Sequence, residues 1–190
     1  MDKLHLIVPC HFGVESVLKR EIIDLGYEIE RVEDGRITFS GNLLAICRAN
    51  VFLRTAERVM IQVGRVKAQT YDELFEAVKA LKWSDFIPEN GKFWVKKASS
   101  VKSKLFSPSD IQRIVKKAIV ENLKQEYGVS WFSEDGASYP IRVFFYKDEA
   151  VIALDTSGES LHKRGYRYYT SKAPISETLA AALIMLTPWN

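Results

Sequence analysis

The first 66 residues of this 190-residue chain alternate between two apolar periodicities, and their order limits the folds that the chain can adopt. Residues 4–9 form a short apolar run that is typical of a strand, and apolar residues in 14–25 recur at helical spacing. Two alternating segments then flank the turn signal Glu33-Asp34-Gly35. A second helical segment and a strand at 58–66 follow. The predicted order is strand, helix, strand, strand, helix, strand.

This order is the pattern of a ferredoxin-like domain, in which two helices cover one face of an antiparallel sheet. Gly26 is placed to end the first helix, because glycine readily adopts the left-handed conformation that closes many helices. Asn42 is suited to cap the second helix. The residues of that helix that we expect to face the core are Leu43, Leu44, Cys47 and Val51. The fold class predicted for the whole chain is α+β.

A second unit is expected after residue 66. Thr70 and Glu73 form a capping box for one helix, and Ser107 with Pro108 opens a longer helix that ends before Gly128. Strands are expected at 93–98, 141–146 and 150–154, with a polar loop at 101–106 and with the last two strands joined as a hairpin.

Composition excludes several classes of protein. A hydrophobic content of 47% allows a sizeable core in one or two compact domains. Cys10 and Cys47 lie far apart without a Cys-x-x-Cys motif or a Cys/His cluster, which argues against zinc and against a disulfide framework. No apolar run approaches the length of a membrane span. We therefore expect a soluble protein of the reducing cytoplasm, with no metal and no membrane contact.

Basic residues concentrate in two parts of the chain. Residues 92–124 contain nine Lys or Arg and two Asp or Glu, a net charge of +7, so the other residues carry −4 of the overall +3. Residues 162–172 contain four bases and no acid, namely Lys163, Arg164, Arg167 and Lys172. Two basic segments in an otherwise acidic chain indicate a site for a polyanion.

The long helix from Ser109 separates apolar from basic residues. Its apolar stripe consists of Ile111, Ile114, Val115, Ala118, Ile119 and Leu123. The bases Arg113, Lys116, Lys117 and Lys124 are expected on the opposite side, since steps of three, four and seven residues return to one helix face. The ordinary interpretation of such a face is that it is only solvated.

The loop before this helix favours a functional interpretation. Lysine side chains, serine hydroxyls and the free N–H groups of a helix N-terminus can all contact phosphate. The loop supplies Lys102, Ser103, Lys104 and Ser107. Lys97 extends the basic track into the preceding strand; because strand neighbours point to opposite faces, we expect at most one of Lys96 and Lys97 to share the surface. The alternative is that such lysines protect a sheet edge.

The segment 162–169 interleaves cations with tyrosines that can stack on unpaired bases. Its candidate binding residues are Lys163, Arg164 and Arg167. The alternative is an interdomain linker whose side chains pack between domains.

No catalytic constellation is predicted. Cys10 and His11 are adjacent in an extended segment, where neighbouring side chains diverge. His162 has no partner at the spacing of helical metal ligands. Gly26 and Gly35 are explained by a helix end and a turn, so neither indicates a phosphate loop.

The chain ends in an apolar helix. Pro174 suits its first turn, residues 179–186 are apolar almost all round, and Pro188 stops it. Such a helix needs cover on most sides, so we expect its partner to lie in residues that this chain lacks.

The C-terminal region also carries a resemblance to a known family. The strings involved are Leu161-His162-Lys163-Arg164-Gly165-Tyr166-Arg167, Ala173-Pro174 and Glu177-Thr178-Leu179-Ala180-Ala181-Ala182. They resemble the junction of THUMP-domain RNA methyltransferases, where the RNA-binding half meets the S-adenosylmethionine domain. Further matches at 12–18, 83–88 and 153–158 extend the resemblance over essentially the whole chain. The family's cofactor motif Asp-Pro-x-Cys-Gly-Ser-Gly and its catalytic Asn-Pro-Pro-Tyr are not in this sequence.

The resemblance implies a ferredoxin-like domain at 1–65, an α/β THUMP domain at 66–158, a linker at 159–172 and the first helix of a Rossmann-like methyltransferase domain at 173–190. The THUMP profile of the family can begin near residue 44. It also implies that the chain, which is not itself an enzyme, binds structured RNA and positions a guanine for N2 methylation. Ribosomal RNA is the first expectation and transfer RNA the second. S-adenosylmethionine would belong to the covalently continuous methyltransferase domain, with no cofactor in this chain.

Two alternatives stay open. THUMP domains also occur in tRNA-modifying enzymes such as thiouridine synthetases and deaminases, although Glu177-Thr178-Leu179-Ala180-Ala181-Ala182 argues against these. The chain could instead be a protein-interaction module that docks through its C-terminal helix.

Overall fold

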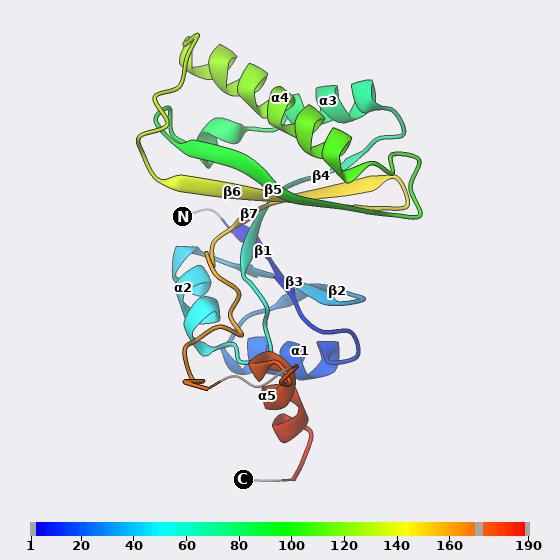
Figure 1. Ribbon diagram of the computed structural model, residues 1–190, viewed down its shortest axis with the longest axis vertical. Helices are drawn as coiled ribbons and strands as arrows, with labels where there is room; N and C mark the ends of the chain where they lie inside the picture. The colour runs from blue at the N-terminus through cyan, green and yellow to red at the C-terminus, as the bar shows by residue number, and fades with distance from the viewer. Residues whose placement is uncertain (1–2, 170–172, 189–190) are drawn as a thin grey trace. The chain divides into compact units, whose positions relative to one another are not determined.

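The computed structural model describes residues 3–169 and 173–188. The chain divides into two compact units (Figure 1). Unit 1 comprises Met1–Ile61 and Thr156–Asn190, and unit 2 comprises Gln62–Asp155. The C-terminal part of the chain therefore belongs to the same unit as the N-terminal part.

Unit 1 has the predicted ferredoxin-like order. Its elements are β1 (Leu4–Pro9), α1 (Glu15–Asp24), β2 (Ile29–Glu33), β3 (Arg36–Gly41), α2 (Leu43–Phe52) and the start of β4 (Met60–Lys67), with α5 (Glu177–Met185) added at the end. The strand order is β2-β3-β1-β4, and β1 pairs antiparallel with both β3 and β4. The core lies between this sheet and its helices, with Leu6, Leu18 and Phe39 fully buried.

The caps of unit 1 are as predicted, but the buried face of α2 is not. Asn42 accepts a hydrogen bond from the N–H of Ala45 at 3.0 Å, and Gly26 ends α1 with φ +86°. The residues expected inside α2, Leu43, Leu44, Cys47 and Val51, are all exposed. Ala45 and Ala49 are buried instead. Because apolar residues lie on most sides of α2, periodicity could not select the buried face. The two alanines let the helix lie close to the sheet.

Unit 2 places two helices on one face of its strands (Figure 1). Its elements are the rest of β4, α3 (Tyr71–Lys79), the 3₁₀ turn η1 (Trp83–Asp85), β5 (Lys92–Val101), α4 (Pro108–Tyr127), β6 (Ser138–Tyr146) and β7 (Glu149–Asp155). The strand order is β4-β7-β6-β5, with β5 parallel to β6 and β6 antiparallel to β7. Both helices pack over buried side chains such as Phe93, Val143 and Phe145.

The helix ends of unit 2 follow the sequence signals. Ser107 accepts a hydrogen bond from the N–H of Asp110 at 3.4 Å, Pro108 occupies the first turn, and Gly128 closes α4 with φ +68°. Thr70 caps α3 through the N–H of Glu73. Well-defined ends explain why the twenty residues of α4 could be predicted from sequence.

The strand β5 contains an irregularity beside Lys96 and Lys97. The register with β6 shifts between Val95 and Lys97, so alternation is broken at this point. Lys96 and Lys97 are both exposed as a result. Strict alternation therefore does not decide which of these lysines lies on the basic surface, and the assignment of Lys97 stays a prediction.

Helix α5 begins later than expected and is partly covered. Ser176, not Pro174, forms the start, because its hydroxyl accepts a hydrogen bond from the N–H of Leu179. Ala182 belongs to the core of unit 1, and Leu179 packs against it. The side chains of α5 that remain exposed are Leu183 and Ile184.

Candidate nucleic-acid interface

The basic side chains of α4 divide between its two flanks. Lys116 Nζ lies 5.9 Å from the ring centroid of Phe93 on β5, whereas Lys117 Nζ lies 5.5 Å from that of Phe75 on α3. Both lysines are exposed. The predicted single basic face is therefore a broader surface, because a step of one residue turns a helix by about 100°.

Arg113 is exposed and has an acidic partner on the same helix. Its guanidinium donates to Asp110 Oδ1 at 2.8 Å, and its side chain is 76% exposed. An exposed pair of this kind contributes about 0–1 kcal/mol. Arg113 can therefore exchange Asp110 for a phosphate at little cost.

Hydrogen bonds hold the loop between β5 and α4 to neighbouring segments of unit 2. The N–H of Lys104 donates to Asp148 Oδ1 at 2.7 Å, and Lys104 Nζ donates to Gln69 Oε1 at 2.7 Å. The N–H of Asp148 donates to Ser103 Oγ at 3.0 Å. Figure 1 shows the three loops that carry these residues, β4–α3, β5–α4 and β6–β7, at one end of unit 2. The loop is thus fixed in position, and Lys102 and Lys104 are exposed on it.

The two predicted serines have internal roles. Ser103 Oγ donates to the carbonyl of Val101 while it accepts from Asp148, and Ser107 Oγ caps α4. These contacts favour the lysines over the hydroxyls as the phosphate-binding groups of the loop. Lys97 is exposed on β5, so it is accessible as well.

Arg164 is committed to contacts within unit 1. It donates to the carbonyls of Leu161, Val51 and Leu53 at 3.0, 2.9 and 2.7 Å. The last two carbonyls lie at the C-terminal end of α2, where helical acceptors lack partners within the helix. This geometry favours the linker interpretation for Arg164 over contact with RNA.

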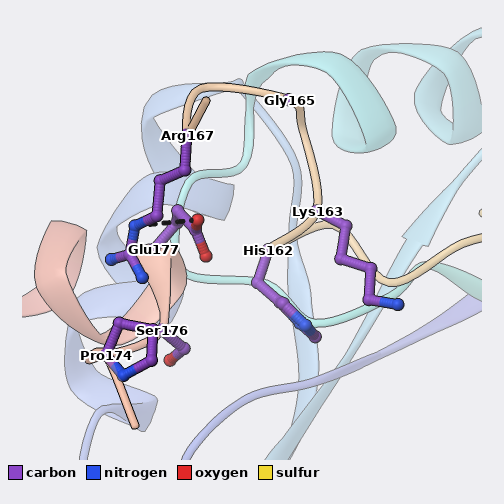
Figure 2. Close-up of a pocket in the computed structure, with 7 residues that line it drawn as sticks. All are labelled: His162, Lys163, Gly165, Arg167, Pro174, Ser176 and Glu177. Atoms are coloured by element: carbon purple, nitrogen blue, oxygen red, sulfur yellow. Dashed lines mark ion pairs between the residues drawn. The ribbon is translucent and has the colours of Figure 1, made fainter. Parts of the chain in front are cut away.

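Lys163 and Arg167 line a pocket of about 430 Å³ beside the start of α5 (Figure 2). Arg167 Nε lies 3.2 Å from Glu177 Oε1, so part of its charge is already balanced. The other lining residues are His162, Gly165, Pro174, Ser176 and Glu177. Lys172, the fourth base of this segment, lies outside the described residues.

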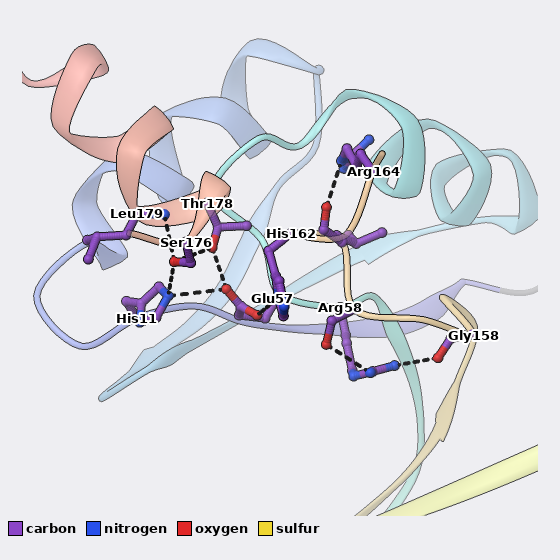
Figure 3. A network of polar contacts seen from close by, with 11 residues as sticks. His11, Glu57, Arg58, Gly158, His162, Arg164, Ser176, Thr178 and Leu179 are labelled. Atoms are coloured by element: carbon purple, nitrogen blue, oxygen red, sulfur yellow. Dashed lines mark hydrogen bonds and ion pairs between the residues drawn. The ribbon is translucent and has the colours of Figure 1, made fainter. Parts of the chain in front are cut away.

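A polar cluster centred on Glu57 was not foreseen from the sequence (Figure 3). Glu57 Oε1 lies 3.3 Å from His11 Nε2 and accepts a hydrogen bond from Thr178 Oγ1, while Glu57 Oε2 lies 3.0 Å from His162 Nδ1. His11 Nε2 also lies 3.0 Å from Ser176 Oγ. The cluster therefore joins the β1–α1 loop, the segment after β7 and the start of α5.

The chemistry of Cys10 argues against a nucleophile. Burial, with smaller contributions from the nearby carboxylates of Glu15 and Glu57, raises the pKa of its thiol to about 12. A thiol with this pKa is almost entirely protonated at neutral pH, and the thiolate is the reactive form.

The described parts of the chain contain neither a metal-ligand cluster nor a helix that could span a membrane. In residues 3–169 and 173–188, no group of three or more His, Cys, Asp or Glu side chains is arranged to hold a metal ion. Among those residues, every helix is too short or too polar to cross a membrane.

Family comparisons assign both parts of the chain. The family model of the RlmL ferredoxin-like domain matches residues 5–60, and the THUMP family model matches residues 68–155. The chain is an RlmL-type ferredoxin-like domain followed by a THUMP domain. The resemblance seen in the sequence is confirmed for these two domains. The basic loop and α4 thus belong to the THUMP domain.

Three curated relatives match nearly the whole chain. "Putative RNA methyltransferase YpsC" of Bacillus subtilis is 54% identical over 192 residues, covering 100% of this chain and 49% of that protein. "Ribosomal RNA large subunit methyltransferase K/L" of Pseudomonas aeruginosa is 32% identical, covering 99% and 26%. "tRNA (guanine(6)-N2)-methyltransferase" of Methanocaldococcus jannaschii is 30% identical, covering 94% and 48%.

A solved structure also matches the whole of this chain but only part of its own. The crystal structure of SMU.472 in complex with SAH has a TM-score of 0.92 and 41% identity, covering 100% of this chain and 50% of that one. The chain with its THUMP domain thus spans about half, or less, of the length of these relatives.

Proposed function

We propose that this chain is the RNA-binding, substrate-positioning part of an S-adenosylmethionine-dependent RNA methyltransferase that modifies guanine N2 in ribosomal RNA. The observation that carries the proposal is the THUMP domain, in which the loop between β5 and α4 is held by hydrogen bonds and presents lysines beside the basic helix α4. Phosphate contacts dominate the affinity of most nucleic-acid-binding proteins, and they need accessible cations held in place. The accessible cations of this surface are Lys102, Lys104, Arg113, Lys116 and Lys117. Hydrogen bonds hold the side chains of Lys104 and Arg113 to Gln69 and Asp110.

The relatives support the reaction and the target. YpsC is named for RNA methylation, the K/L protein for ribosomal RNA of the large subunit, and the archaeal relative for guanine N2. The cofactor would be held by a methyltransferase domain continuous with α5, and such an enzyme would work in the cytoplasm.

A second candidate substrate is transfer RNA. The archaeal relative at 30% identity is named for transfer RNA, so the same module could position a tRNA. A comparison of a large-subunit ribosomal RNA fragment with a tRNA transcript of similar length decides between them. The ribosomal proposal expects tighter binding of the ribosomal fragment at equal salt.

The basic experiment is a titration of the 190-residue chain with labelled RNA and with DNA of the same sequence. The proposal expects saturable binding that favours RNA, because A-form shape and 2′-hydroxyl groups distinguish RNA from DNA. A parallel calorimetric titration with S-adenosylhomocysteine should show no heat of binding. Absence of RNA binding would contradict the proposal. It would favour the alternative of a protein-interaction module that docks through the exposed residues of α5.

A further inference from the structure

One residue of the fixed loop has no role in the contacts described above. Phe106 is 80% exposed, although it follows Leu105, which is 5% exposed. Burying a phenylalanine is worth about 1.5–3 kcal/mol, so its exposure forgoes a stabilisation that the buried leucine obtains. A single exposed apolar side chain is ordinary by itself. The surroundings of Phe106 make it a candidate for binding.

The backbone on both sides of Phe106 is held in place. On one side, Ser100 Oγ donates to the carbonyl of Leu105 at 2.5 Å, and the N–H of Lys104 donates to Asp148. On the other side, Ser107 caps α4. The ring is therefore presented from a fixed loop, which reduces the conformational entropy lost on binding.

The charge around the ring is that of a nucleic-acid site. Lys102 and Lys104 precede it, and both are exposed. Lys104 Nζ donates to the neutral acceptor Gln69 Oε1, while the carboxylate of Asp148 accepts from the backbone N–H of Lys104. An exposed ring beside cations combines the two components with which proteins bind unpaired nucleotides: base stacking and backbone neutralisation.

We propose that Phe106 is a stacking platform for an unpaired base of the RNA, with Lys102 and Lys104 holding the adjacent phosphates. This inference rests on the proposed RNA-binding function and assigns to it a specific preference. The module would favour RNA with single-stranded nucleotides next to a helix over fully paired RNA. Stacking is tolerant of base identity, so the preference concerns unpaired structure and not sequence.

The THUMP domain contains a matched control. Trp131 is 83% exposed and lies in the loop between α4 and β6. Figure 1 shows that loop at the end of unit 2 opposite the β5–α4 loop. Acidic residues follow it at Glu134 and Asp135. Trp131→Ala removes a similar exposed aromatic area in an acidic setting.

The experiment measures the affinity of the 190-residue chain for an RNA hairpin with a single-stranded tail and for the same hairpin without it. Phe106→Ala should weaken binding of the tailed hairpin about five- to 150-fold, which corresponds to about 1–3 kcal/mol for one stacked base. Binding of the blunt hairpin should change little. Phe106→Trp should restore the preference, Phe106→Leu should not, and Trp131→Ala should leave both affinities unchanged.

The outcomes separate this inference from the function on which it rests. If wild-type chain binds neither RNA, the proposed function fails and the inference fails with it. If wild-type chain binds RNA but Phe106→Ala binds the tailed hairpin equally well, only the inference fails. Full rescue by Phe106→Leu, or equal weakening for both hairpins, would also overturn it, because neither result needs a stacked base. Phe106→Leu keeps an apolar side chain at this position, so it serves as a second variant if the alanine variant does not fold.

Discussion

Glu57 shows most clearly what a single residue contributes to this fold. Its carboxylate contacts His162 and Thr178, which are 105 and 121 residues further along the chain. No periodicity or motif links such distant positions, so the sequence alone does not predict the contact between Glu57 and His162. Contacts between residues so far apart in the sequence are defined only by the three-dimensional structure.

We predict that Glu57→Ala lowers the free energy of unfolding by about 1–3 kcal/mol, because hydrogen bonds to a charged group are among the stronger ones. Glu57→Gln should cost less, since the amide oxygen still accepts. Urea denaturation measures both. Glu28→Ala, which removes an exposed carboxylate, is the control. If Glu57→Ala and Glu28→Ala unfold at the same urea concentration, the cluster does not stabilise unit 1.

The two cysteines should differ in reactivity. Burial and nearby carboxylates raise the pKa of the Cys10 thiol to about 12, whereas Cys47 is exposed on α2. At neutral pH the native chain should therefore take up one equivalent of iodoacetamide, at Cys47. Mass spectrometry of the Cys47→Ser variant provides the control, since it should remain unmodified until denaturant is added. Rapid alkylation of Cys10 in native protein would contradict the assigned burial.

At the scale of elements, helix-capping residues predicted the helix ends better than apolar periodicity predicted the buried faces. Asn42, Thr70 and Ser107 all cap the helices expected of them, because each side-chain oxygen meets a free N–H group. Periodicity failed on α2, where apolar residues lie on most sides of the helix, and the register shift beside Lys96 interrupts the alternation of β5. The buried side of α2 depends on neighbours that the local sequence does not specify.

Helix α5 should be held firmly at its start and weakly at its end. Ser176 caps the helix and Thr178 contacts Glu57, whereas Leu183 and Ile184 near its end are half exposed. We expect its amides to exchange with solvent faster than those of α4, and fastest in the last turn. Hydrogen exchange of the dilute monomer tests this. Protection equal to that of Ile111 to Leu123 would mean that α5 is fully covered within these 190 residues.

At the scale of the whole molecule, the sequence predicted the α+β fold and the resemblance predicted both domains, as the family comparisons confirm. The charge pattern located the basic part of the THUMP domain, because net charge can be counted without a structure. It did not show that Ser103 is used internally or that Phe106 is presented outward. The role of Ser103 depends on its contact with Asp148, a residue in the turn between β6 and β7.

The measurement that tests the central claim most directly is the salt dependence of RNA binding. If the THUMP surface makes about four phosphate contacts, the logarithm of the affinity should fall with the logarithm of salt concentration with a slope near −3, at about 0.7 per contact for single strands. Lys104→Glu with Lys116→Glu should weaken binding to every RNA and make the slope shallower, while stability changes by about 1 kcal/mol or less per exposed charge. The control is Lys19→Glu with Arg20→Glu, which makes the same change in net charge on exposed positions of α1. Unchanged affinity and slope in the Lys104/Lys116 variant, or an equal loss in the α1 control, would contradict RNA binding by this surface.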